Sequence, residues 1–347
     1  MSEQKRVRVE LRHSNDQEPG YTRKRMGRYW AYFDEHGERV TSRDTIDRLN
    51  SIALPPAYTD AWFCKDSNGH LQATGIDARG RKQYRYHPDF RASAEKNKFA
   101  GLVQFGKALP KIRRRVRADL RKRSLSREKV LAAAVRLLDT EHLRVGNEQY
   151  ARANKSFGLT TLRSRHVRNQ GQKVKMRFTG KHGIVREVTI TDRTLGRIVK
   201  HCQELPGQAL FQYINGDGLP HPITSADVND YIREASSGDF TAKHFRTWAA
   251  SVIAFEKLLE ASEERRKISV VTMVEPVAEA LGNTVAISRK SYVHPKLIEA
   301  AKERPRDPLP DFECPLERKF LSASEVGLLK FLEAEKNSLK RAKRSAA

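Results

Sequence analysis

The stretch KMRFTGKHGIVREVTI (residues 175–190) contains two segments in which apolar and polar residues alternate. They flank Gly180-Lys181-His182-Gly183, and two alternating segments around a glycine-containing turn predict a β-hairpin. The chain on both sides of this hairpin has helical periodicity instead. The combination predicts a mainly helical domain that carries an inserted hairpin.

Capping residues mark several of the predicted helices. Ser126 is suited to cap the helix that follows it, and Thr224 opens a capping box. A long helix is predicted over residues 244–260, and Gly282 suits the position just after a helix. Residues 92–347 are therefore predicted to form a helical catalytic domain, which ends in a short basic tail at about residue 338.

Residues 28–91 have the texture of β-structure. AWFCK and HLQATGID flank the turn Asp66–Gly69 and predict a hairpin, and RKQYRYH (residues 81–87) predicts a further strand. Residues 1–27 are polar and basic without a sustained period, and we expect them to form a flexible arm. The predicted fold class is thus α+β, with a small β-rich domain before the helical one.

The 347 residues include 66 lysines and arginines against 42 aspartates and glutamates, a formal net charge of +24. Such a charge favours polyanions, because basic groups that displace the counterions of nucleic acid gain entropy. The densest basic segment is KIRRRVRADLRKRSLSREK (residues 111–129), predicted to contact DNA or RNA, with a solvated helix face as the alternative. No amphipathic helix at either terminus favours a membrane surface.

Other classes of protein lose support by omission. No apolar run approaches the ~18 residues of a membrane span, and the N-terminus lacks a signal-peptide core, so we expect a soluble, cytoplasmic protein. Three separated cysteines (Cys64, Cys202 and Cys314) argue against a disulfide framework or a zinc ribbon. Without a phosphate-binding loop, an HExxH motif or a compact set of acids, we expect no ATP, metal or other cofactor.

Phosphodiester transfer without metal makes three demands on side chains. An oxygen must attack phosphorus, the charge on the non-bridging oxygens must be stabilised, and a proton must reach the departing ribose oxygen. Tyrosine suits the first task, because phenoxide leaves more readily than alkoxide. Arginine suits the second through two parallel hydrogen bonds to phosphate, and lysine suits the third as a tunable proton donor.

Six segments carry residues of these types, namely GIDARGRKQYRYH (75–87), LRVGNEQY (143–150), FGLTTLRSRHV (157–167), RFTGKHG (177–183), AKHFRTWA (242–249) and LGNTVAISRKSYVHP (281–295). In this order and spacing they resemble the type IB DNA topoisomerases of the compact, poxvirus-like kind that is also found in bacteria. The resemblance covers roughly residues 28–300. It implies that the helical domain has the fold shared by tyrosine recombinases and type IB topoisomerases.

The resemblance also implies roles for individual residues. Arg144 and Arg246 would clamp the scissile phosphate, and Lys181 would be the general acid. Tyr292 would form a 3′-phosphotyrosyl bond and free a 5′-hydroxyl strand, which rotates about the intact strand before it is rejoined. The expected protein is a bacterial, nucleoid-associated monomer that binds double-stranded DNA and relaxes supercoils of both signs without ATP.

One position departs from the pattern of many relatives, which have histidine nine residues before the tyrosine. Here that position is Asn283, whose neutral side-chain N–H can also donate to a non-bridging oxygen. We expect activity to survive with an altered pH dependence. No residue is identified as the base for Tyr292.

A second set matches positions of the family that contact DNA: Arg79, Arg81, Gln83, Tyr84 and Tyr86 in the β-rich domain, with Tyr150 and Lys243 in the helical one. Strand alternation places both tyrosines of the β-rich domain on one face, where a role in the core is the alternative. Each catalytic candidate has a structural alternative too, such as a helix cap for Arg144 or a solvated turn for Lys181.

Two other functions stay open at this point. A tyrosine recombinase would use the same chemistry, but recombinases typically have histidine three residues before the second arginine, where this chain has Lys243. A non-enzymatic DNA-binding protein of the nucleoid explains the charge equally well. It requires no ordered set of arginines, lysine and tyrosine, and it predicts that Tyr292→Phe changes nothing.

Overall fold

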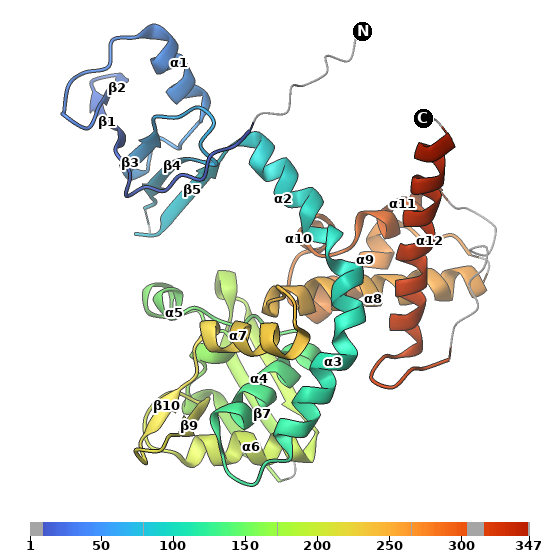
Figure 1. Cartoon of the computed structure of the whole chain (residues 1–347). Helices are drawn as coiled ribbons and strands as arrows, with labels where there is room; N and C mark the ends of the chain where they lie inside the picture. The colour runs from blue at the N-terminus through green and yellow to red at the C-terminus, as the bar shows by residue number, and fades with distance from the viewer. Residues whose placement is uncertain (1–9, 79, 172, 265, 304–315, 346–347) are drawn as a thin grey trace. The chain divides into compact units, whose positions relative to one another are not determined.

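The computed structural model describes residues 10–78, 80–171, 173–264, 266–303 and 316–345, and its chain divides into two units, residues 1–100 and 101–347 (Figure 1). The first unit is mostly β-structure, and the second is mainly helical with small sheets. The predicted α+β class is confirmed.

The first unit is built on one antiparallel sheet with strand order β2-β1-β3-β4-β5. Its elements are β1 (Gly20–Met26), β2 (Tyr29–Phe33), α1 (Arg43–Ser51), β3 (Thr59–Cys64), β4 (Leu71–Ile76), β5 (Lys82–Tyr86) and α2 (Pro88–Ala100). The predicted hairpin around Asp66–Gly69 is present as β3 and β4. Leu49 of α1 packs with Tyr32 and Phe63 in the core of this unit.

Strand β1 lies within the segment that the sequence analysis assigned to a flexible arm, of which residues 1–9 lie outside the described part. It pairs with both β2 and β3. The strand escapes prediction because Arg23 occupies a partly buried position where an apolar residue would be expected. Its guanidinium lies 4.4 Å from the ring centroid of Trp30 and donates to the carbonyl oxygen of Leu54 at 2.8 Å.

The boundary between the units also differs from the predicted one at residue 91. Helix α2 groups with the first unit, which ends at Ala100. Phe90 in its first turn accounts for this, because its ring packs against His70 and Tyr86 at centroid distances of 4.9 and 5.4 Å.

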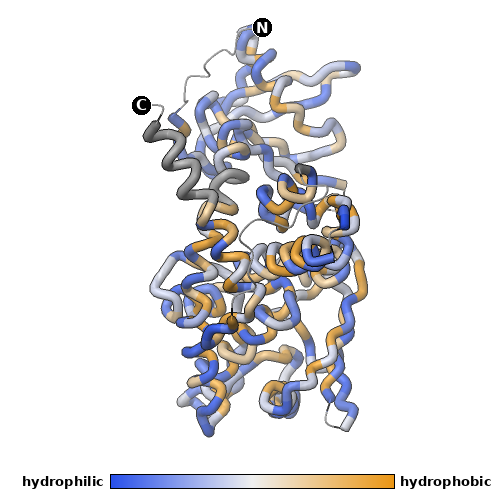
Figure 2. The backbone as a smooth tube through the Cα atoms, turned by 90° about the vertical axis from the view of Figure 1, so that its right-hand side faces the viewer, coloured by the Kyte–Doolittle hydropathy of each residue, from blue (hydrophilic) through white to orange (hydrophobic). Residues whose placement is uncertain are grey.

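The second unit is arranged around α4, most of whose side chains are buried, and α3, α7 and α8 pack against it. Its helices are α3 (Leu102–Leu120), α4 (Arg127–Glu141), α5 (Glu148–Asn154), α6 (Arg193–Glu204), α7 (Ser225–Ser236), α8 (Ala242–Glu263), α9 (Val270–Leu281), α10 (Val285–Ser291), α11 (Pro295–Glu303) and α12 (Ala323–Ser345). The predicted caps at Ser126, Thr224 and Gly282 are present. Figure 2 shows hydrophobic and hydrophilic residues interspersed along these elements.

The predicted hairpin forms two strands of a three-stranded sheet with order β6-β7-β8. Its strands are β6 (Val167–Gln170), β7 (Lys173–Thr179) and β8 (Val185–Ile190), and a separate pair is β9 (Gln212–Ile214) with β10 (Pro220–Pro222). Val174, Met176 and Phe178 of β7 are buried, while Lys175 and Arg177 between them are exposed. Strand β7 therefore has one apolar, buried face and one basic, exposed face.

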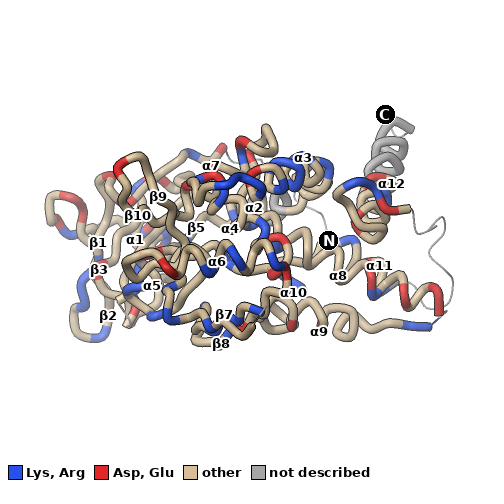
Figure 3. The backbone as a smooth tube through the Cα atoms, turned by 90° about the horizontal axis from the view of Figure 1, so that it is seen from below, with Lys and Arg blue, Asp and Glu red and all other residues tan. Residues whose placement is uncertain are grey.

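Part of the basic segment 111–129 serves internal ion pairs. Arg113 of α3 binds Asp139 of α4 and Glu325 of α12, each at 2.7 Å. Although partial burial acts against it, the two acids raise the pKa of Arg113. Other arginines of α3 are exposed, and Figure 3 shows basic residues recurring along this helix. Nucleic-acid contact by this segment stays a prediction for those exposed residues.

Among the described residues, no single helix is long and apolar enough to cross a membrane. Helices α9 and α10 meet the length and composition criteria only as a pair, and the chain bends by 94° between them.

Candidate active site and nucleic-acid interface

Arg144 lies in the loop that follows α4, and a second loop braces it. The backbone N–H of Leu159 donates to the carbonyl oxygen of Arg144 at 2.8 Å. Gly146 has a φ of +101°, and a Cβ added to Gly158 would come within 2.6 Å of the Cα of Gly146. The two glycines are needed here for this backbone conformation and for the close approach of the two loops.

Arg246 lies on α8 and is only 4% exposed. One terminal nitrogen donates to the carbonyl oxygen of Leu281 at 3.0 Å, and the other donates to that of His142. Leu281 is the last residue of α9, where carbonyl groups have no partner within the helix and carry the negative end of its dipole. The helix end therefore holds the guanidinium in a buried place without a carboxylate.

Asn283 follows α9 directly after Gly282 and contacts Arg144. The Arg144 Nη2 donates to Asn283 Oδ1 at 2.6 Å, although the two residues are 139 positions apart. Because a guanidinium only donates, this contact orients the amide with its oxygen toward Arg144. The amide Nδ2 is buried and has no hydrogen-bond partner in the described part of the chain. It is an unused donor in the site.

Tyr292 caps the C-terminal end of α10 beside Arg246. The guanidinium carbon of Arg246 lies 5.1 Å from the centroid of the Tyr292 ring. Ser251 of α8 fixes the backbone at this point: its hydroxyl lies 3.4 Å from the carbonyl oxygen of Tyr292, and it accepts from the backbone N–H of His294 at 3.2 Å. Sequence analysis did not identify this buried serine.

A third arginine, Arg186 of β8, completes a cationic group with Arg144 and Arg246. Its two terminal nitrogens donate to the carbonyl oxygens of Glu279 and Ala280 at 3.3 and 2.9 Å. Sequence analysis missed Arg186, although a signal was available. Strand alternation places it on the same face as buried Val188 and Ile190, where a charged residue is unusual.

The positive charge of Arg144 lies close enough to Arg186 and Arg246 to lower the pKa of both, which favours binding of an anion. Burial, and after it the neighbouring charge of Arg144, lower the pKa of Arg246 to about 10. Burial and Arg144 also lower the pKa of Arg186. Within the described residues, no ion pair joins Arg144, Arg186 or Arg246 to a carboxylate. Positive charge concentrated in a partly buried place, without a counterion of its own, is suited to a bound phosphate.

Lys181 is not brought into this group of contacts. It lies exposed in the turn between β7 and β8, which the hydrogen bond from the Gly180 N–H to the Ile184 carbonyl oxygen closes at 2.7 Å. Among the described residues, no hydrogen bond or ion pair joins Lys181 to Tyr292, Arg144 or Asn283. The structure therefore brings four of the five predicted catalytic residues together and leaves Lys181 at the hairpin tip.

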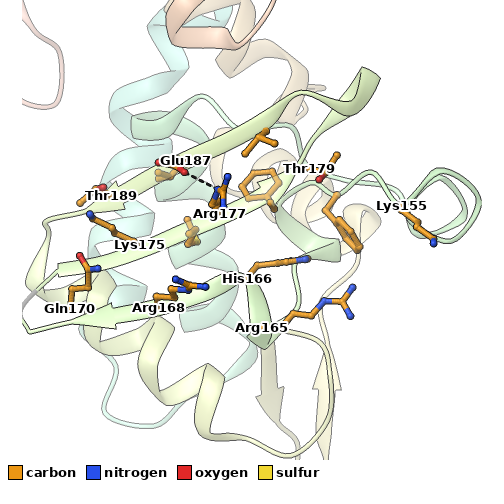
Figure 4. A pocket seen from close by; sticks show the side chains of 15 residues that line it. Lys155, Arg165, His166, Arg168, Gln170, Lys175, Arg177, Thr179, Glu187 and Thr189 are labelled. Carbon is orange, nitrogen blue, oxygen red and sulfur yellow. Dashed lines mark ion pairs between the residues drawn. The ribbon is translucent and has the colours of Figure 1, made fainter.

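The exposed face of the same sheet forms a basic groove of about 770 Å³ that reaches Thr179 and Val185, the last pair of residues before the hairpin turn (Figure 4). Its basic residues are Lys155, Arg165, Arg168, Lys175 and Arg177, and its one acid, Glu187, is paired with Arg177 at 2.9 Å. Arg168 and Lys175 lie directly opposite each other on β6 and β7. Like charges in that register cost stability, so the arrangement indicates a polyanion-binding face.

Among the predicted DNA contacts of the first unit, Tyr84 and Tyr86 are exposed, and Arg81 and Gln83 are partly buried. Tyr84 and Tyr86 are 50% and 40% exposed, and their rings stack at a centroid distance of 6.2 Å, which argues against the core alternative. The carboxylate of Asp77 accepts from Arg81 Nε at 2.8 Å and from Gln83 Nε2 at 2.9 Å, which orients both side chains. Arg79 lies outside the described residues.

The two remaining candidates are exposed in the second unit. Tyr150 lies on α5 and is 44% exposed, and Lys243 lies in the first turn of α8. The described residues contain no group of three or more His, Cys, Asp or Glu side chains able to hold a metal ion.

A tyrosine beside arginines that form no ion pair with a described carboxylate, on a helical domain with a basic hairpin, is the arrangement expected of the DNA strand-transfer enzymes, a class that includes topoisomerases and recombinases. Comparisons with known proteins distinguish between the two. Residues 87–307 match the catalytic core of eukaryotic DNA topoisomerase I, and residues 29–77 match the N-terminal domain of bacterial DNA topoisomerase IB.

Similar proteins point to the same family. DNA topoisomerase 1B of Acanthamoeba polyphaga mimivirus is 33% identical over 296 residues, covering 82% of this chain and 88% of that protein. DNA topoisomerase 1B of Vaccinia virus (strain Copenhagen) is 20% identical over 271 residues, covering 74% and 82%. The chain belongs to the type IB DNA topoisomerase family, which confirms the predicted family and enzyme class.

Among solved structures, a post-cleavage complex of the XerH site-specific recombinase with a palindromic difH substrate aligns over 56% of this chain and 50% of that chain. The identity is 15% and the TM-score is 0.35. A similarity this low supports no statement about mechanism.

Proposed function

We propose that this protein relaxes supercoiled DNA of both signs by a reversible nick in one strand, with Tyr292 as the nucleophile. The observation that carries the proposal is the joint placement of Tyr292, Arg246, Arg144 and Asn283 around an anion site whose arginines form no ion pair with a carboxylate of the described residues. A binding protein without chemistry has no need of a tyrosine within reach of a buried arginine.

The proposed reaction begins when a backbone phosphate enters this site. Arg144 and Arg246 donate to its non-bridging oxygens, and the unused Nδ2 of Asn283 supplies a further hydrogen bond. The Oη of Tyr292 attacks phosphorus, the P–Oη bond forms and the P–O5′ bond breaks. These donors act because negative charge on the phosphate oxygens grows toward the transition state.

The departing O5′ must receive a proton, and Lys181 is the proposed donor. The proton of Tyr292 leaves to a base that is not assigned. Rotation of the freed strand about the intact one then relaxes the duplex. In the reverse step the O5′ hydroxyl attacks the phosphotyrosine and returns its proton to Lys181. The P–O5′ bond forms again, the P–Oη bond breaks, and the oxygen of Tyr292 recovers its proton from the unassigned base. Because the covalent bond conserves the energy of the phosphodiester, the cycle needs no ATP.

Duplex DNA is the proposed partner along the basic groove of the second unit and at Arg81, Gln83, Tyr84 and Tyr86 of the first. Tyr150 and Lys243 are proposed to add phosphate contacts. Phosphate contacts of this kind position the protein and bind without regard to sequence. One nucleophile acting on one strand requires only a monomer, and a nucleoid-associated role in the cytoplasm of a bacterium follows from this function.

The test is relaxation of negatively and positively supercoiled plasmid in EDTA without ATP, with Tyr292→Phe as the matched variant. We expect relaxation of both signs by the unmodified protein and none by the variant. A nicked oligonucleotide that loses its 5′-hydroxyl strand on cleavage should trap a covalent adduct at Tyr292. If neither protein relaxes DNA and both bind it equally well, the proposed function is wrong: an adduct at Tyr292 would then indicate a recombinase, and its absence a binding protein.

A further inference from the structure

The side chain of Arg186 lies between two segments of the proposed active site. Its stem approaches the turn that carries Lys181, since a Cβ added to Gly180 would lie 3.5 Å from Arg186 Cγ. Its guanidinium lies against the corner between α9 and α10, where a Cβ on Gly282 would lie 2.4 Å from Arg186 Nη1. Gly180 directly precedes Lys181, and Gly282 directly precedes Asn283.

Hydrogen bonds fix the orientation of the Arg186 guanidinium against the end of α9. Arg186 binds the carbonyl oxygens of Glu279 and Ala280 in the last turn of α9, and that of Glu279 also accepts from the backbone N–H of Gly282 at 3.1 Å. One planar guanidinium therefore ties β8, and with it the hairpin, to the segment that leads to Asn283 and Tyr292. Within the described part of the chain, Lys181 itself makes no hydrogen bond or ion pair to that segment.

The placement is costly for a purely structural role. Arg186 occupies the apolar face of β8, opposite buried Phe178 on β7, and it stands near the charge of Arg144 without an ion pair to a carboxylate. An apolar side chain at this position would fill the same face without desolvating a cation next to another cation. The arrangement favours a function that needs an arginine here.

We propose that Arg186 is a positioning residue for the general acid, because it links the Lys181 hairpin to the segment that carries Asn283 and Tyr292. The inference rests on the proposed function, in which Lys181 protonates the departing O5′. Without the link the hairpin would sample many orientations, and the proton donor would meet the leaving oxygen less often. Binding of the phosphate by Arg144 and Arg246 would persist.

The decisive experiment compares two scissile linkages in single-turnover cleavage of a suicide oligonucleotide: the ordinary phosphodiester and one with sulfur in place of O5′. A thiol has a pKa of roughly 8.5, against about 16 for water as a guide to an alcohol, so a thiolate leaves without a general acid. Defects in proton donation should therefore disappear with the sulfur linkage, whereas defects in charge stabilisation or folding should persist.

We expect Arg186→Ala to cleave the ordinary linkage ~10–100-fold more slowly, as is typical when a supporting contact is lost. With the sulfur linkage it should cleave within about threefold of the unmodified protein, as should Lys181→Ala. Arg246→Ala should be slow on both linkages. Arg197→Ala, at an exposed arginine of α6, is the control and should match the unmodified protein on both.

Two further variants separate charge from geometry. Arg186→Lys keeps the charge but cannot bridge two carbonyls with a planar fork, so it should recover only part of the lost rate on the ordinary linkage. Gly282→Ala should imitate Arg186→Ala, because the new Cβ displaces the guanidinium. Thermal denaturation of each variant establishes that it is folded at the assay temperature.

Equal impairment of folded Arg186→Ala on both linkages would overturn the inference while leaving the proposed function intact. Full recovery of the rate by Arg186→Lys would likewise overturn it, because charge alone would then suffice. If the sulfur linkage does not rescue Lys181→Ala, the general acid has been assigned wrongly. That result would contradict the proposed function at this residue, and the inference with it.

Discussion

Replacing Asn283 tests the chemistry of the anion site most directly, because its two side-chain ends have separate tasks. Oδ1 accepts from Arg144 at 2.6 Å, and Nδ2 is buried without a partner. Asn283→Ala removes both, whereas Asn283→Asp keeps an acceptor for Arg144 and replaces the donor with a charged oxygen. The two variants therefore separate the support of Arg144 from the donation to phosphate.

The expected magnitudes follow from these contacts. Losing one preorganised donor to a developing oxyanion costs about 2.7–4 kcal/mol, so Asn283→Ala should cleave ~10²–10³-fold more slowly. The aspartate adds repulsion from the phosphate, roughly 4 kcal/mol for unit charges at about 4 Å near a protein surface, which Arg144 partly offsets. Asn283→Asp should therefore be at least about tenfold slower than Asn283→Ala, although it is closer in shape to asparagine.

The assay is single-turnover formation of the covalent adduct at saturating protein, with DNA affinity measured separately on an uncleavable duplex. Affinity should change little, because the donor acts mainly in the transition state. Asn283→His should retain most of the rate, and its rate relative to asparagine should rise as the pH falls through about 6.5, where an imidazole gains charge. Cleavage by Asn283→Ala within threefold of the unmodified protein, or Asn283→Asp no slower than alanine, would refute the reasoning.

Three further predictions follow from other parts of the second unit. Burial lowers the pKa of His294 to about 4 in the folded protein, below its value of about 6.5 in the unfolded chain. The stability that His294 allows is therefore complete above pH 6.5. The free energy of unfolding should fall by about 3 kcal/mol as the pH drops to 4, at ~1.4 kcal/mol per pH unit. Urea unfolding should show this loss, and a His294→Gln variant with the same pH dependence would contradict it. In the basic groove, Arg168→Gln and Lys175→Gln should each lower the slope of log binding constant against log salt concentration by about the amount of one phosphate contact, without lowering the melting temperature. An unchanged slope would show that DNA does not contact the groove. Gly158→Ala places a Cβ 2.8 Å from the carbonyl oxygen of Arg144, so it should destabilise the protein by ~1–3 kcal/mol and slow cleavage. A variant with the stability and the cleavage rate of the unmodified protein would contradict the tight packing of the two loops.

The elements that could be predicted from the sequence are those marked by a short pattern, such as strand alternation around a turn or a helix cap. The β7–β8 hairpin follows from alternation around Gly180–Gly183, and the start of α7 follows from Thr224 and its capping box. Strand β1 escaped because Arg23 stacks on Trp30 in a partly buried place, where a pattern of apolar residues would have identified it. A charged residue in a partly buried position thus hid one strand, whereas Arg186, on the buried face of a strand that was predicted, was a signal left unused.

The candidate site shows a different limit. Resemblance to a family identified Arg144, Arg246, Asn283 and Tyr292, and the structure brings these four together. That Asn283 would contact Arg144 depends on how the end of α9 meets the loop after α4, which no local pattern encodes. The same holds for Ser251, whose role depends on α8 passing beside the backbone of Tyr292.

The carbonyl groups at the end of α9 have a consequence for the protein before DNA arrives. They lower the cost of burying Arg186 and Arg246 by dipole contact and leave the unit charge of each guanidinium uncancelled. Since no carboxylate in the described part of the chain forms an ion pair with these guanidiniums, we expect a phosphate to enter with little electrostatic reorganisation. The same arrangement is suited to small tetrahedral oxyanions, so we expect sulfate or inorganic phosphate in a buffer to compete with the DNA backbone for this site.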